Sequence, residues 1–346
     1  MDTAPPAPPP APPTATTPAA PADPRQVKDV LIPVDGLIDP QQVPPKAKAG
    51  GACKLGIDEA GRGPVLGAMT FGCCYWAIEE DADIEQDQKE INDSKQLTED
   101  KRSQLFERVL NDDRLGWSVE VVSAARLSRE MLRKKAPISL NMISFDATCR
   151  LIQGTLDRGV DVVEAYVDTV GDPDVYSDRL TRHFDGRIAF TVAKKADSIY
   201  KCTGAASICA KVVRDESLRR WVFAERGIND REFGSGYPSD PQCVEWMKRN
   251  AHAVFGFPGI CRFSWAPAKQ RLGDVDAVDD DVRANFGFVA KVQFDEEQDD
   301  SAVANTMKIT EWATASKKKV DGPVAKKRRR AHFYRRLETL SSLSEL

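Results

Sequence analysis

Alternation of apolar and polar residues predicts five β-strands in the central part of the chain. In the first of them, the apolar residues Leu55 and Ile57 lie two positions apart and the polar Asp58 follows, which is the side-chain period of a strand. The fourth repeats this pattern and also ends in an acid. The predicted strands are the segment that ends at Asp58 and residues 68–77, 117–122, 162–168 and 188–192.

Apolar residues that recur every three or four positions predict helices between and after these strands. Thr98 precedes such a stripe, and the two acids that follow it suit the positive end of a helix dipole. Residues 79–90 are predicted to form an acidic surface loop. The predicted helices cover residues 98–110, 126–135, 139–159, 174–184, 205–226 and 241–250, and a last helix ends near residue 272. Together the elements indicate an α/β domain.

Composition divides the chain into three parts. The first 25 residues are almost wholly Pro, Ala and Thr, which bury too little apolar surface to offset the entropy lost on ordering. Apolar islands at 307–312 and 333–346 interrupt a polar tail, a pattern typical of segments that dock on a partner. We therefore expect a disordered segment over 1–50, one compact domain over 51–272 and a mostly disordered tail over 273–346.

Charge changes this picture locally. The net charge is -4, from 49 Lys and Arg against 53 Asp and Glu, which argues only weakly against a nucleic-acid partner. Acidic residues crowd 274–281 and 295–300, whereas basic residues crowd 317–319 and 326–330. Each basic cluster is compatible with three interpretations: a solvent-exposed charged segment, an accessory DNA contact or a nuclear import signal. Of these, the import signal is favoured, so we expect a nuclear protein.

Cysteine spacing and hydropathy argue against a disulfide-bonded, zinc-binding, membrane or secreted protein. The eight cysteines show neither CxxC nor Cys/His ligand spacing, so we expect reduced thiols in an intracellular protein, with no disulfide and no zinc site. No stretch approaches the length of a membrane span, and the proline-interrupted start does not resemble a signal peptide.

Candidate chemistry begins where the first strand ends. Asp58 is followed by a second acid, Glu59, and then by the turn Gly61-Arg62-Gly63. Glycine allows another molecule to approach the main chain closely. Two carboxylates beside bare backbone and an arginine suit a divalent metal next to a phosphate. An ordinary solvated loop is the alternative, because adjacent acids before a glycine turn are common in loops.

Two further acids lie in informative positions. Asp168 ends the fourth predicted strand, where a simple turn is the alternative. Asp215 lies in the middle of the apolar stripe predicted for the helix over 205–226, and burial of an uncompensated carboxylate costs several kcal/mol. Salt bridges to Lys211 and Arg219 would each contribute only about 0.3–0.5 kcal/mol. A metal ion is therefore the favoured partner of Asp215.

These motifs resemble those of the type 2 ribonucleases H. The run from Asp58 to Pro64, Asp-Glu-Ala-Gly-Arg-Gly-Pro, is similar to the signature of that family, and the similarity extends from about Lys54 to Arg271. The chain looks most like the eukaryotic catalytic subunit, which works beside two non-catalytic subunits. Further motifs in the family's order are Asp93-Ser94-Lys95, Leu140-Asn141, Val167 to Gly171, Lys195-Ala196-Asp197, Ala205 to Val212, Arg214-Asp215, Gly234 to Pro238 and Phe255 to Pro258.

The resemblance implies a fold and a set of site residues. The fold would be an RNase H-like five-stranded mixed sheet flanked by helices, with a C-terminal helical extension. The catalytic and metal-binding carboxylates would be Asp58, Glu59, Asp168 and Asp215, holding two Mg²⁺ or Mn²⁺ ions. The substrate contacts would be Gly61, Arg62 and Gly63 on the ribose 2′-hydroxyl and Tyr237 on the neighbouring deoxyribose, with Lys95, Asn141 and Lys195 as candidates for phosphate or sugar contacts.

The expected activity is hydrolysis of the RNA strand of RNA/DNA hybrids and nicking of duplex DNA 5′ to single embedded ribonucleotides. Such an enzyme would serve ribonucleotide excision and RNA primer removal in DNA replication and repair, as part of a heterotrimer whose other subunits dock on its C-terminal part. A metal nuclease specific for DNA, a catalytically silent scaffold and a phosphate-binding regulator are the alternatives. All four acids are present, which disfavours the scaffold, and no nucleotide-cradle motif supports the regulator.

Overall fold

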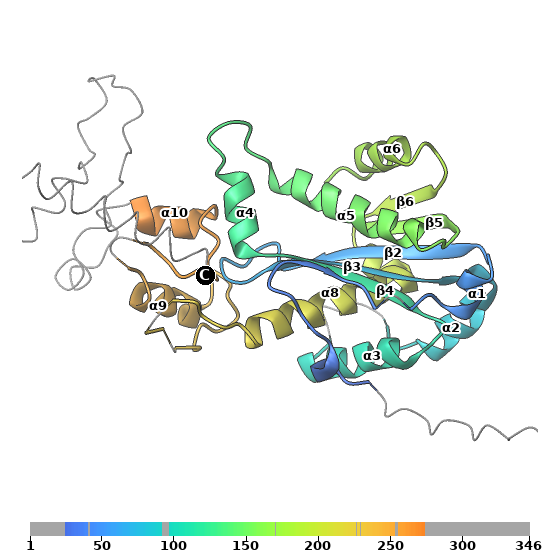
Figure 1. The fold of residues 1–346 in the computed structure, drawn as a ribbon, viewed down its shortest axis with the longest axis horizontal. Helices are drawn as coiled ribbons and strands as arrows, with labels where there is room; N and C mark the ends of the chain where they lie inside the picture. The colour runs from blue at the N-terminus through green and yellow to red at the C-terminus, as the bar shows by residue number, and fades with distance from the viewer. Residues whose placement is uncertain are drawn as a thin grey trace, which may run out of the picture.

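The fold is built on a mixed β-sheet with helices on both faces (Figure 1). A computed structural model of the chain describes residues 25–40, 42–91, 97–169, 171–225, 227–228, 230–252 and 255–273. Within them the sheet has six strands in the order β1-β4-β3-β2-β5-β6. Their bounds are β1 Gly36–Ile38, β2 Cys53–Ala60, β3 Met69–Ala77, β4 Gly116–Val122, β5 Val162–Asp168 and β6 Ala189–Ala193.

Strand β2 lies at the change from antiparallel to parallel pairing. It pairs antiparallel with β3, which pairs antiparallel with β4, and it pairs parallel with β5, which pairs parallel with β6. All five predicted strands are therefore present, and the mixed sheet is confirmed. The predicted number of five is wrong by one, because β1 adds an antiparallel strand at the edge of β4.

Helices cover the two faces of the sheet in two layers. The helices α5 and α6 lie on one side, and α3 and α8 lie on the other (Figure 1). The bounds are α1 Pro45–Lys48, α2 Asp81–Asp87, α3 Glu99–Asn111, α4 Ala124–Met131, α5 Leu140–Asp157, α6 Pro173–His183, α7 Ala196–Ile199, α8 Lys201–Arg219, α9 Pro241–Arg249 and α10 Ala266–Gly273, with 3-10 turns at Val27–Asp29 and Ile78–Glu80.

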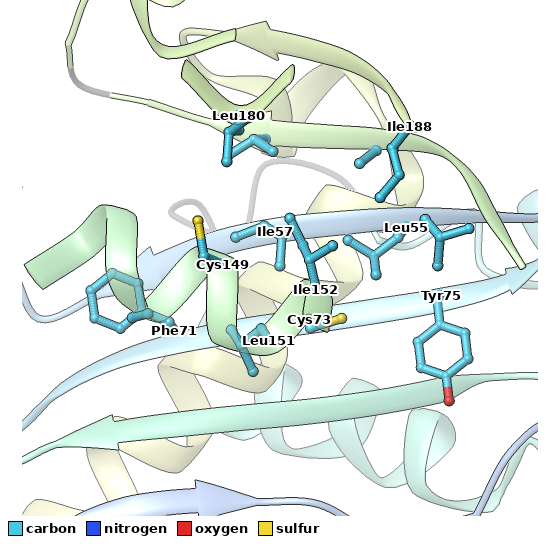
Figure 2. Packing of buried hydrophobic residues seen from close by; sticks show 14 of the residues in the cluster. Leu55, Ile57, Phe71, Cys73, Tyr75, Cys149, Leu151, Ile152, Leu180 and Ile188 are labelled. Atoms are coloured by element: carbon cyan, nitrogen blue, oxygen red, sulfur yellow. The ribbon is translucent and has the colours of Figure 1, made fainter. Parts of the chain in front are cut away.

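Alternation along the strands divides the core between these layers. Leu55 and Ile57 of β2 point toward α5, where they pack with Ile152 (Figure 2). Cys74 and Trp76 of β3 belong to the opposite cluster, which includes residues of α3 and α8. The period-2 pattern of the sequence is thus the physical reason that one sheet supports two separate cores.

Helix α8 approaches the sheet unusually closely because two glycines face it. A Cβ atom on Gly56 would lie 2.1 Å from the carbonyl carbon of Cys202, and one on Gly72 would lie 2.2 Å from the carbonyl oxygen of Ala206. The absence of side chains therefore lets the α8 backbone rest directly on β2 and β3.

A third core joins the C-terminal helices to the loop between β2 and β3. Trp246, Met247 and Ala268 pack with Leu66. Arg262 is fully buried, and its guanidinium donates from Nε to the carbonyl oxygen of Gly67 at 2.8 Å and from Nη2 to that of Ala68 at 2.7 Å. The predicted C-terminal helical part is thus attached to the sheet domain by side-chain hydrogen bonds to the backbone as well as by packing.

Three predictions about boundaries are wrong. The structured domain begins before residue 51, because β1 pairs with β4 and Ala47 is buried in the core. The acidic segment 79–90 contains helix α2, which buries Ile84 and places Asp81 beside Lys54. Helix α8 runs from 201 to 219 and not from 205 to 226. The tail over 273–346 lies outside the described residues apart from Gly273, the last residue of α10.

All eight cysteines of the chain are buried free thiols. Burial raises the pKa of Cys53 and of Cys73 to about 11, so little reactive thiolate forms at neutral pH. We expect a thiol reagent such as DTNB to label almost no cysteine in the native protein at pH 8 and all eight after unfolding in guanidinium chloride without a reducing agent. Rapid labelling of several thiols in the native protein would contradict this burial.

Within the described part of the chain, no helix combines the length and the apolar character that crossing a bilayer requires.

Candidate active site

The site lies at the edge of the sheet where β2 and β5 end side by side. The two strands are parallel and Ile57 is in register with Val167, so the acids that follow them, Asp58 and Asp168, emerge at the same edge. Ligand sites of mixed and parallel sheets form at such carboxyl ends. The pairing confirms that these two strand-end acids, more than a hundred residues apart in the sequence, are neighbours in the fold.

Asp58 is a buried carboxylate on the α8 side of the sheet. Its Oδ1 accepts a hydrogen bond from the backbone N–H of Glu59 at 2.7 Å, and its side chain is hydrogen-bonded to Ser207. Burial, and next the charge of Asp168, raise the pKa of Asp58 to about 7, while the ammonium of Lys211 opposes this shift. The carboxylate is therefore held in a place where additional positive charge would stabilise its ionised form.

Glu59 points to the opposite face, toward α5, as the alternation predicts. Its Oε1 accepts from Arg62 at 3.1 Å, and Arg62 also hydrogen-bonds to Asn141 at the start of α5. Burial raises the pKa of Glu59, and the guanidinium of Arg62 opposes that effect. Two predicted substrate contacts, Arg62 and Asn141, are thus brought together, and the arginine connects the glycine turn to α5.

A pocket of about 200 Å³ opens between these acids and the helices α5 and α6. Three of the four predicted carboxylates line it, together with Arg62 and Asn141. The rest of the wall is formed by Ser144 and Thr148 of α5, by Thr169, Gly171 and Asp172 after β5, and by Val175, Tyr176 and Arg179 of α6. The pocket is consequently acidic at the sheet edge and contains hydroxyl groups and one further cation on the helical side.

Asp168 is oriented by a backbone group that depends on Lys195. The N–H of Ala196 donates to Asp168 Oδ1 at 2.9 Å. Lys195, the residue before it, has φ 60° and ψ 36°, a left-handed conformation that non-glycine residues rarely adopt. The structure therefore gives Lys195 a role in the chain path beside Asp168, and its predicted phosphate or sugar contact stays a prediction.

Asp215 lies on α8 but does not line the pocket. Its side chain is 25% exposed, with Arg214 at 2.9 Å and Arg102 at 3.5 Å. Ile208, Val212 and Leu218 of the predicted stripe are buried, but Asp215 among them is only partly buried. Val222 is 78% exposed, because α8 ends before it at Arg219. The positive partners are therefore arginines.

The lysine and the arginine considered as partners for Asp215 pair with other acids. Lys211 lies 3.9 Å from Asp197, and Arg219 pairs with Glu99 and Glu216. Among the described residues, no group of three or more His, Cys, Asp and Glu side chains is placed to hold a metal ion together. Shared metal binding by all four acids therefore stays a prediction, and Lys95 lies outside the described residues.

The glycine turn and Tyr237 lie against each other. A Cβ atom on Gly63 would be 3.1 Å from Cε1 of the Tyr237 ring, which is 41% exposed. The carbonyl oxygen of Gly236 accepts hydrogen bonds from the N–H groups of Val65 and Leu66, and this fixes the two loops together. Gly61 has φ +81°, which explains glycine at that position. Of the three predicted 2′-hydroxyl contacts, Gly63 thus lies beside the predicted stacking ring.

Comparison with known proteins identifies the family. The family model for ribonuclease HII matches residues 55–268. The chain belongs to the ribonuclease HII family. It is similar to the A subunit of ribonuclease H2 from Arabidopsis thaliana, with 44% identity over 70% of this chain and 82% of the relative, and to that from Homo sapiens, with 45% identity over 64% and 73%. Membership of the ribonuclease HII family identifies the chain as a ribonuclease H enzyme.

Solved structures agree with the ribonuclease HII assignment. Ribonuclease H2 from Pyrococcus horikoshii superposes with a TM-score of 0.53 at 30% identity, covering 63% of this chain and 96% of that protein. Bst-RNase HIII in complex with Mn²⁺ superposes with a TM-score of 0.50 at 19% identity, covering 66% and 72%, and at that identity it supports the fold alone. The RNase H-like fold is confirmed.

The donor set of this ribonuclease HII site suits a hard divalent cation. Asp58, Glu59 and Asp168 offer carboxylate oxygens, which Mg²⁺ and Mn²⁺ prefer, and no cysteine or histidine lines the pocket in the described part of the chain. Burial, and next the charge of Asp168, raise the pKa of Asp58, so a bound cation would stabilise its ionised form. The residues therefore fit a metal ion chemically.

Sequence reasoning missed the α6 wall of the pocket and the arginines beside Asp215. Arg179 and Tyr176 lie on an amphipathic helix whose polar residues look like ordinary surface residues. Arg102 belongs to α3, more than a hundred residues before Asp215, so no local spacing indicates the pair. Of these residues, only Arg214 was indicated by the sequence, because it is adjacent to Asp215 in a motif of the family.

Proposed function

We propose that this ribonuclease H cuts the RNA strand of RNA/DNA hybrids and nicks duplex DNA 5′ to single ribonucleotides, leaving 3′-hydroxyl and 5′-phosphate ends. The observation that carries the proposal is the contact between the Gly63 backbone and the Tyr237 ring, beside the strand that bears Asp58 and Glu59. The bare glycine backbone can donate to and accept from a ribose 2′-hydroxyl, the group that distinguishes RNA from DNA. The exposed ring can stack on the sugar of the next nucleotide. A deoxyribose fits there better than a ribose, because it has no 2′-hydroxyl to clash with the ring.

Metal ions complete the proposed mechanism. Asp58, Glu59, Asp168 and Asp215 would hold two Mg²⁺ or Mn²⁺ ions, which supply charge stabilisation to the phosphate and an acidified water when bound. The chain's own residues hold the acids in place: the Glu59 N–H and Ser207 hold Asp58, the Ala196 N–H holds Asp168, and Arg62 holds Glu59. Asp215 itself is held by Arg214 and Arg102.

Cleavage of three labelled 20-base-pair duplexes tests the proposal. The duplexes are an RNA/DNA hybrid, a DNA duplex with one ribonucleotide, and an all-DNA duplex of the same sequence. We expect products from the first two in Mg²⁺, none from the third, and none from any in EDTA. Cleavage of the all-DNA duplex would instead support a DNA-specific nuclease, and a protein that cuts none of them, alone or with co-expressed partners, would support the scaffold alternative.

We also propose that the chain works inside a complex in the nucleus. Its relatives are named as one of the subunits of ribonuclease H2, which supports the presence of further subunits. The C-terminal helices α9 and α10, with Phe255 80% exposed beside them, are the proposed docking region for two non-catalytic subunits. Ribonucleotide excision and primer removal in DNA replication and repair are the proposed roles of that complex.

A further inference from the structure

The α6 side of the active-site pocket presents an arginine that the proposed reaction does not use. Val175, Tyr176 and Arg179 all line the pocket. Arg179 comes four residues after Val175 and three after Tyr176, so the three side chains share one face of α6. This wall belongs to the same pocket as the acids at the end of β2 and Arg62 of the glycine turn.

Arg179 is held in place by an aromatic ring and a thioether. Its guanidinium carbon lies 3.7 Å from the centroid of the Phe145 ring, and its Nη2 is directed at the sulfur of Met142. Phe145 is only 5% exposed, so it provides a fixed platform. In the described part of the chain, no carboxylate lies within 4 Å of the Arg179 guanidinium, whereas Arg62 at the same pocket is paired with Glu59.

The chemistry of this arrangement favours a phosphate. A guanidinium has five N–H donors in a fixed plane, and a thioether is a weak acceptor that satisfies at most one of them. A planar arginine held on an aromatic ring, with donors left for a bidentate acceptor, is well suited to phosphate. The pocket, of about 200 Å³, has room for a backbone phosphate beside this guanidinium.

Two other polar side chains of this wall already have hydrogen-bond partners within the protein. The Tyr176 hydroxyl is 3.3 Å from the hydroxyl of Thr148. Asp172, the remaining charged group, caps α6, and its Oδ1 accepts from the N–H groups of Asp174 and Val175. Among the described residues that line this wall, Arg179 is therefore the cation that attracts an anion.

We propose that Arg179, presented on the Phe145 ring, binds a backbone phosphate of the nucleic acid strand that lies along α6. The inference rests on the proposed function, since it assumes a nucleic acid in the pocket, and it adds an anchoring point that does not depend on metal ions. Arg179 is thus a binding residue for substrate, distinct from the carboxylates and from the surface that reads the 2′-hydroxyl.

Salt-dependent binding of the hybrid duplex tests this assignment. The affinity of the full-length wild type, Arg179→Met and Arg179→Lys is measured by fluorescence anisotropy in EDTA at several NaCl concentrations. Loss of one phosphate contact should raise Kd by about tenfold at low salt and lower the slope of log Kd against log salt by about 0.9. Arg179→Lys keeps the charge and should retain the wild-type slope.

Arg182→Met provides the matched control, because Arg182 lies in the same helix, is exposed and does not line the pocket. It should leave both Kd and slope close to wild type. If Arg179→Met keeps the wild-type slope of log Kd against log salt, the assignment is overturned. If that variant also melts at a lower temperature than the wild type, Arg179 has only a structural role in supporting Phe145. A wild type that cuts no hybrid in Mg²⁺ refutes the proposed function itself, which is a different result from an unchanged slope in an active enzyme.

Discussion

Asp58→Asn should reduce hybrid cleavage in Mg²⁺ by about a thousandfold or more, equivalent to about 4 kcal/mol of transition-state stabilisation. The amide keeps the shape of the side chain but removes the charge that the proposed metal ions need. Initial rates on a labelled RNA/DNA hybrid measure the effect. Asp157→Asn, at the exposed end of α5, is the control and should keep wild-type activity. Wild-type turnover by Asp58→Asn would remove that residue from catalysis.

The same substitution should stabilise the metal-free protein in a pH-dependent way. Burial and Asp168 raise the pKa of Asp58 from 3.8 to about 7, so the folded protein retains a proton that the unfolded chain releases. Wild-type stability attributable to this group therefore falls as pH rises from about 4 to 7 and levels off above 7. In urea unfolding with EDTA, the advantage of Asp58→Asn should grow across that interval. An advantage independent of pH would contradict the shift.

Gly56→Ala should destabilise the fold by about 3 kcal/mol or more, because its Cβ would overlap the backbone of α8 at Cys202. The helix cannot move away without opening both the β2 and β3 contacts, since Gly72 faces it in the same way. For a domain of this size, about 3 kcal/mol corresponds to a fall of roughly 10 °C in Tm. Thermal unfolding by circular dichroism measures it.

Gly154→Ala is the control for this prediction and should have the opposite sign. Gly154 lies inside helix α5, and a Cβ atom there would meet nothing within 4 Å. Alanine favours a helix over glycine by about 0.5–1 kcal/mol, so Tm should rise slightly. Equal effects of the two substitutions would show that α8 is not closely packed on Gly56.

The sequence predicted those parts of the fold that follow from local periodicity. The five longer strands and most helices carry a clear alternation or stripe, and Asp58 and Asp168 meet because each ends a strand of the same parallel pair. Strand β1 was missed because it has only three residues in a proline-rich segment, so its pairing with β4 is decided by tertiary contact. Helix α2 was missed because a single buried residue, Ile84, anchors it.

The site was predictable where the motif was local and unpredictable where distant elements meet. The acids at positions 58 and 59 and the turn after them form one continuous signature. The contact between Arg62 and Asn141 joins residues 79 positions apart, and Arg102 reaches Asp215 across 113 positions. Such pairs depend on how α5 and α3 pack against the sheet, which hydrophobic patterning does not specify.

Arg262 links chain segments almost two hundred positions apart. Because its guanidinium holds the carbonyl oxygens of Gly67 and Ala68, just after the turn at Gly61 to Gly63, the shape of that turn depends on residues near the end of the globular region. A protein shortened before residue 262 would lose these two hydrogen bonds, which brace the loop between β2 and β3 from inside. If that loop reads the ribose as proposed above, we expect the shortened protein to discriminate less between RNA and DNA.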